Sequence, residues 1–294
     1  MATQTIAVRA QAQGAQRQAS IVFRQLRRNP TAVIGAALLA LEIVVAVAAP
    51  LLAPYDPLDQ DFTAALKAPS GAHLFGTDDV GRDLLSRVMY GARISLRVGL
   101  IAVAIGGGVG VVLGLLSGFY GGLVAGVILR FMDLLLAFPG LLLALAVVAV
   151  LGPGLFNVML AVGVGGVPVY TRLTHASTLS VRERDYVLGA RAVGCSDARI
   201  MCRYILPNVI PPVLVLATLG VAGAILTAAA LSFIGLGAQP PTPEWGATLT
   251  LGRRYLQQAW WYTVFPGLAL MVTVLAINML GDALRDALDP KLRQ

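Results

Sequence analysis

The amino-acid sequence predicts an all-α integral membrane protein with six transmembrane helices. Hydrophobic residues make up 57% of the 294 positions and charged residues only 13%, about half of the roughly 25% that is usual in soluble domains. Apolar runs of about 20 residues, the length that crosses a bilayer, recur along the chain. A soluble fold could not bury this much apolar surface, so lipid must form part of the solvent.

The apolar runs divide the chain into segments. Residues 1–28 form an N-terminal tail, residues 29–54 the first transmembrane helix and residues 55–93 a polar segment. Residues 94–281 hold five further helices, and residues 282–294 form a polar C-terminal tail. The five spans are predicted at 94–117, 123–151, 158–178, 207–234 and 260–281. Residues 1–20 lack apolar periodicity and are predicted to be disordered.

The first apolar run, 31–53, follows three arginines and so resembles the start of a signal peptide. Its length exceeds the 7–15-residue apolar core of a signal peptide, which favours an uncleaved helix with its N-terminus inside. Pro50, Pro54 and Pro57 are predicted to end this helix. Glu42 lies in mid-span, where a charge faces protein or water. A helix contact and a role in transport both remain open for it.

The distribution of basic residues sets the orientation. With the N-terminus inside, 15 of the 22 basic residues fall on the inner side and 7 on the outer side. This agrees with the positive-inside rule and predicts that both termini are cytoplasmic. Pro139, in the third span, is expected to kink it.

Glycines recur every fourth residue in the second span, at Gly106, Gly110, Gly114 and Gly118. This spacing places them on one face of a helix, and a face without side chains lets another helix approach closely. The sequence leaves two partners open, a helix of the same chain or a helix of a second subunit that moves against it.

Composition and motifs exclude several classes of function. The basic residues are scattered among apolar runs, which argues against nucleic-acid binding despite a formal charge of +7. The chain has no His-Glu-x-x-His, Gly-x-Ser-x-Gly or Gly-x-x-x-x-Gly-Lys-Ser/Thr motif, so no hydrolytic site or ATP site is predicted. Cys195 and Cys202 lack His or acidic ligands at metal spacing and are interpreted as small apolar filler. His73 and His175 are isolated and are expected to make ordinary polar contacts.

The segment 180–207 is too charged to span a bilayer and too apolar to be a linker. Residues 182–192 have helical character, Gly194 interrupts them, and a second short helix is predicted over 198–204, ending at the following Leu-Pro. This predicts a cytoplasmic helix–turn–helix between spans four and five. From these residues alone, a knob that docks into another protein and a solvated loop are equally supported.

This segment resembles the cytoplasmic loop of permeases in binding-protein-dependent ABC importers. The signature there is Glu-Ala-Ala, three residues, Gly, nine residues, Ile, any residue, Leu-Pro. The matching positions are Ala190, Gly194, Leu206 and Pro207, and the departures are Leu188, Gly189 and Tyr204.

Further motifs resemble the dipeptide/oligopeptide/nickel branch of that family, in the same order along the chain. They lie at 74–83, 90–93, 137–139, 231–237, 239–246 and 281–290. The resemblance covers about residues 27–293 and is nearest to the C-type permeases of dipeptide and oligopeptide importers. Ala228 departs from it, since relatives often carry Glu there.

The resemblance implies the fold of a type I ABC importer permease. It also implies a role as one permease subunit for dipeptides, oligopeptides or related small solutes such as nickel chelates or glutathione. The implied partners are a second permease, two ATPase subunits that bind the ATP, and an external substrate-binding protein. No cofactor of the chain's own is expected, and the implied location is the bacterial inner membrane.

The resemblance also assigns roles to residues. Those expected to contact an ATPase are Arg182, Glu183, Arg184, Asp185, Tyr186, Gly189, Ala190, Ala192, Gly194, Asp197, Leu206 and Pro207. Those expected to meet the binding protein on an outer ledge are Asp78, Asp79, Arg82, Pro240, Pro241 and Glu244. The plainer interpretation of the second group is that it caps the helix bundle. The three tryptophans, Trp245, Trp260 and Trp261, are expected at the membrane interface.

Two other classes of protein remain open. A self-contained channel or secondary transporter would show paired intramembrane charges or inverted repeats with broken helices. The sequence offers only Glu42 in mid-span, and Arg130 with Asp133 near the inner boundary. A structural membrane subunit without conduction would need the same partners, so solute uptake by a knockout would separate it.

Overall fold

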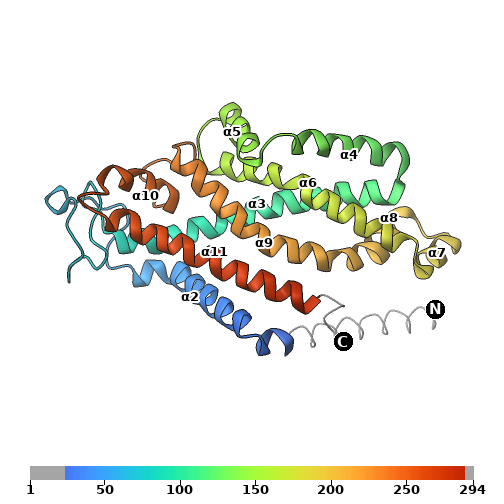
Figure 1. The fold of residues 1–294 in the computed structure, drawn as a ribbon, viewed down its shortest axis with the longest axis horizontal. Helices are drawn as coiled ribbons and strands as arrows, with labels where there is room; N and C mark the ends of the chain where they lie inside the picture. Colours follow the sequence, from blue (N-terminus) through green and yellow to red (C-terminus); the bar gives the residue numbers. More distant parts are fainter. Residues whose placement is uncertain (1–23, 289–294) are drawn as a thin grey trace.

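The computed structural model describes residues 24–288, and helices dominate this part of the chain (Figure 1). The long helices are α2 (Pro30–Leu52), α3 (Leu84–Tyr120), α6 (Leu155–Arg182), α9 (Leu206–Phe233) and α11 (Trp261–Leu288). The shorter ones are α4 (Gly122–Leu136), α5 (Gly140–Leu151), α7 (Asp185–Ala192), α8 (Asp197–Ile200) and α10 (Trp245–Gly252). Within residues 24–288, five helices are long and apolar enough to cross a membrane, and the number is six if the bent pair α4–α5 counts as one broken span. The predicted all-α membrane fold is confirmed.

The helices form a bundle with shorter helices and loops at its two ends. Figure 1 shows α2 and α11 on one flank, α4 and α5 on the opposite flank, and α3, α6 and α9 between them. The turn that carries α7 and α8 lies at one end, and α10 lies at the other. The start of α2 and the end of α11 both point toward the α7 end, as an even number of spans requires.

The glycine stripe of α3 packs against α6 within this chain. A Cβ added to Gly110 would lie 2.5 Å from the Tyr170 Cβ, and one added to Gly114 would lie 2.4 Å from the Thr174 Cβ. Gly106 lies against Gly163 and Gly166 of α6, and Gly118 lies against Thr178. The contact positions on both helices advance together in steps of four, so α3 and α6 run parallel and their backbones approach closely.

The third span is broken rather than kinked. The prediction of one bent helix over 123–151 was wrong, because α4 and α5 meet at 92°. Pro139 is the N-cap residue of α5, with an extended backbone (φ −54°, ψ 132°). Proline has no N–H to donate and disfavours helical geometry in the residue before it, so the chain leaves one helix before starting the next.

Other predicted boundaries were wrong where polar residues were taken as helix ends. α3 begins at Leu84 rather than at 94, because Asp83 caps it by accepting from the Ser86 N–H at 2.8 Å. α11 continues through the polar stretch 282–288. Pro50 lies inside α2, which ends two residues later. The predicted disorder of residues 1–20 and the end of the C-terminal tail lie outside the described residues.

Candidate functional site

The segment after α6 forms a compact helical turn, here called the knob (residues 183–205), at one end of the bundle (Figure 1). α7 ends at Ala192 and the chain turns at Gly194, whose φ of +77° lies in the left-handed region that favours glycine. The predicted short helix that stops at Leu-Pro was wrong. α8 runs through a π-helical stretch, Met201–Ile205, directly into α9. This stretch precedes Pro207, whose missing N–H would interrupt an ordinary α-helical ladder.

The knob is anchored from inside and presents apolar side chains outside. Val187, Ile200 and Ile205 are fully buried in one cluster with the end of α3. Leu188 and Val193 are 45% and 79% exposed on a surface that is otherwise charged or small. An exposed apolar patch rimmed by polar residues on a rigid base is typical of a protein interaction site.

The residues expected to contact an ATPase are mostly on this surface. The exposed ones are Glu183, Arg184, Asp185, Gly189, Ala192, Gly194, Asp197 and Pro207, and the half-buried ones are Arg182, Tyr186 and Leu206. Ala190 is buried, so the expectation of a direct contact was wrong for it. Arg182 also has a role inside the chain, since its Nη1 donates to the Gly118 carbonyl at 2.8 Å and joins the ends of α6 and α3.

Two loops form a second candidate site, here called the ledge (residues 53–83 and 234–260), at the opposite end of the bundle. Gly76 and Gly81 have φ values of +75° and +81°. A Cβ on Gly81 would overlap the Asp61 carbonyl, and one on Gly76 would lie 2.7 Å from the Trp261 ring. The motif at 74–83 therefore needs glycine at both positions to fold closely over the helix ends.

Asp78 is the centre of a buried network that joins the two loops of the ledge. Its carboxylate accepts from the backbone N–H groups of Val80 (3.0 Å) and Arg82 (2.9 Å) and from the Arg82 Nε (2.6 Å). The Arg87 Nε lies 3.6 Å from the same carboxylate. Arg87 also donates through Nη1 to the carbonyls of Pro57 (3.0 Å) and Pro241 (3.4 Å). Two arginines thus compensate one buried carboxylate and fix both loops.

Glu244 caps α10 inside the ledge. Its two carboxylate oxygens accept from the N–H groups of Gly246 (2.9 Å) and Ala247 (2.8 Å). Burial raises the pKa of the Glu244 carboxyl, and these two backbone hydrogen bonds partly oppose the rise. The next residue, Trp245, donates from its indole N–H to the Val88 carbonyl at 3.0 Å and so ties α10 to α3.

The ledge corrects several expectations. Asp78, Arg82 and Glu244 are 0%, 4% and 3% exposed, so the prediction that they touch a docked protein was wrong. They shape the ledge, as the plainer interpretation held. Pro240 and Pro241 are exposed and Asp79 is partly exposed, and their contact with a binding protein stays a prediction. Trp245 and Trp261 are buried within the chain rather than at its membrane-facing surface, whereas Trp260 is 52% exposed.

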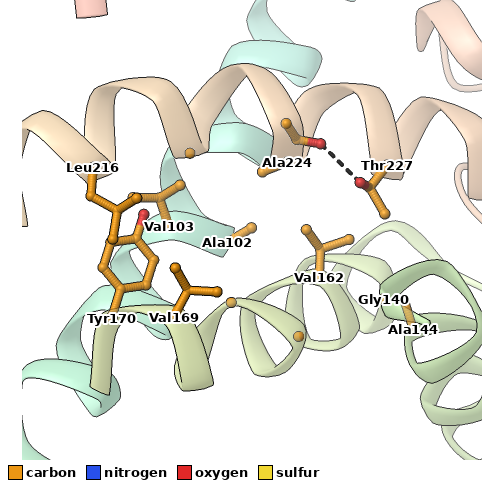
Figure 2. Close-up of a pocket in the computed structure, with 14 residues that line it drawn as sticks. Ala102, Val103, Gly140, Ala144, Val162, Val169, Tyr170, Leu216, Ala224 and Thr227 are labelled. Atoms are coloured by element: carbon orange, nitrogen blue, oxygen red, sulfur yellow. Dashed lines mark hydrogen bonds between the residues drawn. The ribbon is translucent and has the colours of Figure 1, made fainter. Parts of the chain in front are cut away.

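A cavity of about 260 Å³ lies between α3, α5, α6 and α9 (Figure 2). It is lined by Ala102, Val103, Gly140, Ala144, Val162, Gly165, Gly166, Val169, Tyr170, Leu216, Gly220, Gly223, Ala224 and Thr227. None of these side chains is charged, and only Tyr170 and Thr227 carry a hydroxyl. Sequence reasoning missed these residues, and glycines on three separate helices were the only signal for them.

Polar contacts inside the bundle answer further questions that the sequence left open. Glu42 on α2 accepts from the Thr273 hydroxyl on α11, so it makes a helix contact. Asp133 on α4 pairs with Arg172 on α6, and both side chains are about half exposed. The His73 Nδ1 lies 3.0 Å from the Asp83 Oδ1. The His175 Nδ1 lies 2.9 Å from the Ser117 Oγ. The expectation of ordinary polar contacts for both histidines is confirmed.

Comparisons with known proteins agree with this architecture. The protein-family model described as the binding-protein-dependent transport system inner membrane component matches residues 110–294. A second family model, the N-terminal transmembrane domain of oligopeptide transport permease C, matches residues 18–69. The dipeptide transport system permease protein DppC of Escherichia coli (strain K12) is 50% identical, over 92% of this chain and 93% of the relative. The glutathione transport system permease protein GsiD of Escherichia coli O6:K15:H31 (strain 536 / UPEC) is 47% identical, over 92% of this chain and 90% of the relative.

A solved structure supports the fold independently. The inward-facing MetNI methionine ABC transporter matches with a TM-score of 0.55 and 18% identity, over 70% of this chain and 97% of that chain. Sequence and fold therefore agree along most of the length, and this chain belongs to the family of binding-protein-dependent transport system inner membrane components, the permease subunits of ABC importers.

Proposed function

We propose that the chain is one of two permease subunits of an importer for dipeptides or related small peptides in a bacterial inner membrane. ATP is bound and hydrolysed by two separate ATPase subunits, one of which docks on the knob. The knob side of the bundle and both termini face the cytoplasm, and the ledge faces an external substrate-binding protein. The exposed, internally anchored knob is the observation that carries this proposal.

The knob is built to transmit motion. Its fully buried residues lie in one packed cluster with the ends of α3 and α6, and α8 is continuous with α9 through the π-helical stretch. A displacement of the knob would therefore tilt α9 without an intervening flexible loop. ATP shifts the permease between states only to the extent that the docked ATPase binds one state of the knob better than the other.

The flank of α4 and α5 is the proposed contact with the second permease. α4 exposes Leu123, Val127 and Phe131 at 89%, 70% and 57%. The half-exposed pair Asp133–Arg172 lies on the same flank, and a charged pair within spans faces protein or water rather than lipid. The neighbouring cavity between α3, α5, α6 and α9 then forms one wall of the solute path. The peptide class follows from the names of relatives such as the DppC proteins.

Site-directed crosslinking tests the docking. In a chain with Cys195 and Cys202 replaced by alanine, Val193→Cys carries a thiol-linked photo-crosslinker, and Asp59→Cys on the exposed ledge is the control. Position 193 is expected to capture an ATPase subunit, whereas position 59 is not. Absence of an ATPase from the products at position 193, in membranes that retain the assembled complex, would contradict the proposed docking.

A charge in the turn tests the coupling. Gly194→Asp is expected to abolish ATP-linked uptake while the chain stays in the membrane at its normal level, because the knob loses its turn geometry. Normal peptide uptake by this variant would contradict a coupling role for the knob.

A further inference from the structure

We infer that Arg93 and Arg97 of α3 bind the phosphate of an anionic phospholipid, in the membrane leaflet on the ledge side. The inference goes beyond the proposed function, because it depends on the chain crossing a membrane and not on the solute that is carried.

The first observation is a cavity of about 430 Å³ beside the ledge that both arginines line. Arg93 is half-buried and Arg97 is exposed. The two residues are four positions apart on α3, so their side chains lie on the same face of the helix. The Arg93 guanidinium carbon lies 6.0 Å from the centre of the Tyr90 ring, which lines the same cavity. Two guanidinium groups therefore face one open space.

The second observation is the charge balance of this cavity. The arginines of the described chain that form ion pairs are others, namely Arg82, Arg87, Arg172 and Arg182. Asp56 also lines the cavity, but its carboxylate accepts from the Leu58 N–H at 2.8 Å and forms no ion pair with Arg93 or Arg97 within residues 24–288. Two positive charges and one negative charge leave the cavity net positive. The positive-inside rule does not account for arginines at this end of the bundle, so an anion is the fitting ligand.

The third observation is the position of the arginines along α3. Residues 98–120 contain no charged side chain, and at 1.5 Å per residue they measure about 35 Å, close to the roughly 30 Å of a hydrocarbon core. Arg97 therefore lies at the boundary of the apolar part of the helix. On the next turn of the same face, Leu100 and Ile101 are 60% and 39% exposed. A phospholipid would lay its acyl chains on this apolar face and present its phosphate to the arginines.

The chemistry of the headgroup decides which phospholipid fits. A guanidinium group donates two parallel hydrogen bonds to the oxygens of a phosphate, and these charge-assisted bonds are stronger than neutral ones. The phosphodiester of phosphatidylglycerol carries one negative charge and no positive charge. Phosphatidylcholine carries the same phosphate with a fixed positive charge beside it, which two guanidinium groups would repel. The site should therefore prefer phosphatidylglycerol.

Photo-crosslinking in nanodiscs tests the inference. The complex that co-purifies with the full chain is placed in phosphatidylcholine nanodiscs that contain phosphatidylglycerol with a photoreactive group in one acyl chain, and labelled peptides are identified by mass spectrometry. The wild type is expected to be labelled within residues 98–108. Arg97→Gln is expected to lower this label about ten-fold, the factor that corresponds to one lost hydrogen bond between charged groups. Arg97→Lys keeps the positive charge and should keep most of the label.

Arg254→Gln is the matched control, since Arg254 is also exposed at the ledge end but does not line the cavity. Its label is expected to equal that of the wild type, and an excess of inorganic phosphate should not compete with the lipid. An unlabelled wild type would mean that protein covers this face and would overturn the inference. Equal label in Arg97→Gln and the wild type, an equal loss in Arg97→Gln and Arg254→Gln, equal labelling by photoreactive phosphatidylcholine, or loss of label in inorganic phosphate would overturn it as well.

Discussion

Gly110 on α3 lies directly against Tyr170 on α6, so that a Cβ at position 110 would fall 2.5 Å from the Tyr170 Cβ. The same glycine thus serves two purposes. It lets two parallel helices approach closely, and it fixes the position of the tyrosine that lines the cavity. The packing of the glycine stripe and the shape of the proposed solute path depend on each other.

Replacing Gly110 by alanine is therefore expected to destabilise the bundle. The added methyl group has no room, and overpacking of this kind costs about 1–3 kcal/mol. Gly108→Ala on the same helix is the control, because nothing lies within 4 Å of its added Cβ and alanine favours helix over glycine by about 0.5–1 kcal/mol. Thermal unfolding of the purified chains should place Gly110→Ala below the wild type and Gly108→Ala at or above it. Equal midpoints for the two variants would show that α3 and α6 are not in close contact at this position.

Two glycines of the knob are expected to respond differently to alanine. Gly194 has room for a Cβ, but its φ of +77° is unfavourable for other residues by about 1–2 kcal/mol. Gly189 lies in α7 with open space around it, and alanine there matches the family signature. Peptide uptake linked to ATP hydrolysis should fall in Gly194→Ala and stay normal in Gly189→Ala. The reverse order would mean that the turn geometry is not what couples the knob to transport.

Loss of the charge on Asp78 is expected to unfold the ledge. Asp78→Asn leaves Arg82 and Arg87 buried without their shared carboxylate, and breaking a buried ion pair in this way costs about 3–5 kcal/mol. Asp59→Asn is the control, since that side chain is exposed. Limited proteolysis from the ledge side should cut the Asp78→Asn protein within residues 53–83 and leave the control intact. A wild-type cleavage pattern for Asp78→Asn would contradict the role of this network.

Stability is expected to depend on pH through Glu244. Because burial raises the pKa of its carboxyl above the ordinary value of 4.5, the folded state binds this proton more tightly than the unfolded chain does. The resulting stabilisation is fully present below the unfolded pKa and is lost as the pH rises through the folded pKa. Glu244→Gln removes the titration, so the stability of the wild type relative to this variant should decrease as the pH rises from about 4. Thermal unfolding midpoints of both proteins, measured as the pH rises from about 4, would check this prediction. Midpoints that change with pH in the same way in both proteins would contradict it.

The sequence predicted the spans because lipid imposes a length and a composition that can be read directly. It did not predict the break between α4 and α5. Both sides of Pro139 are apolar, and hydropathy carries no information on the direction of a helix axis. The ends of α3 and α11 were missed for a related reason. A capped polar turn such as that after Asp83 looks like a loop when only hydropathy is considered.

The candidate sites were predictable to different degrees. The knob carries a spaced motif, and its position was predicted, although the continuity of α8 with α9 was not. The ledge was expected to present Asp78, Arg82 and Glu244, because the resemblance places them in outer loops that meet the binding protein. Their burial depends on contacts such as that of Arg87 with Pro241, which are 154 residues apart. The cavity was missed because glycine, alanine and valine from four helices carry no chemical signature.

Affinity purification of the tagged chain from gently solubilised native membranes tests the central claim most directly. If the chain is a permease subunit driven by separate ATPases, mass spectrometry should find two ATPase subunits and a second six-helix permease with it. Recovery of this chain alone, in detergents that keep known importers intact, would contradict the proposal and favour a self-contained channel or carrier.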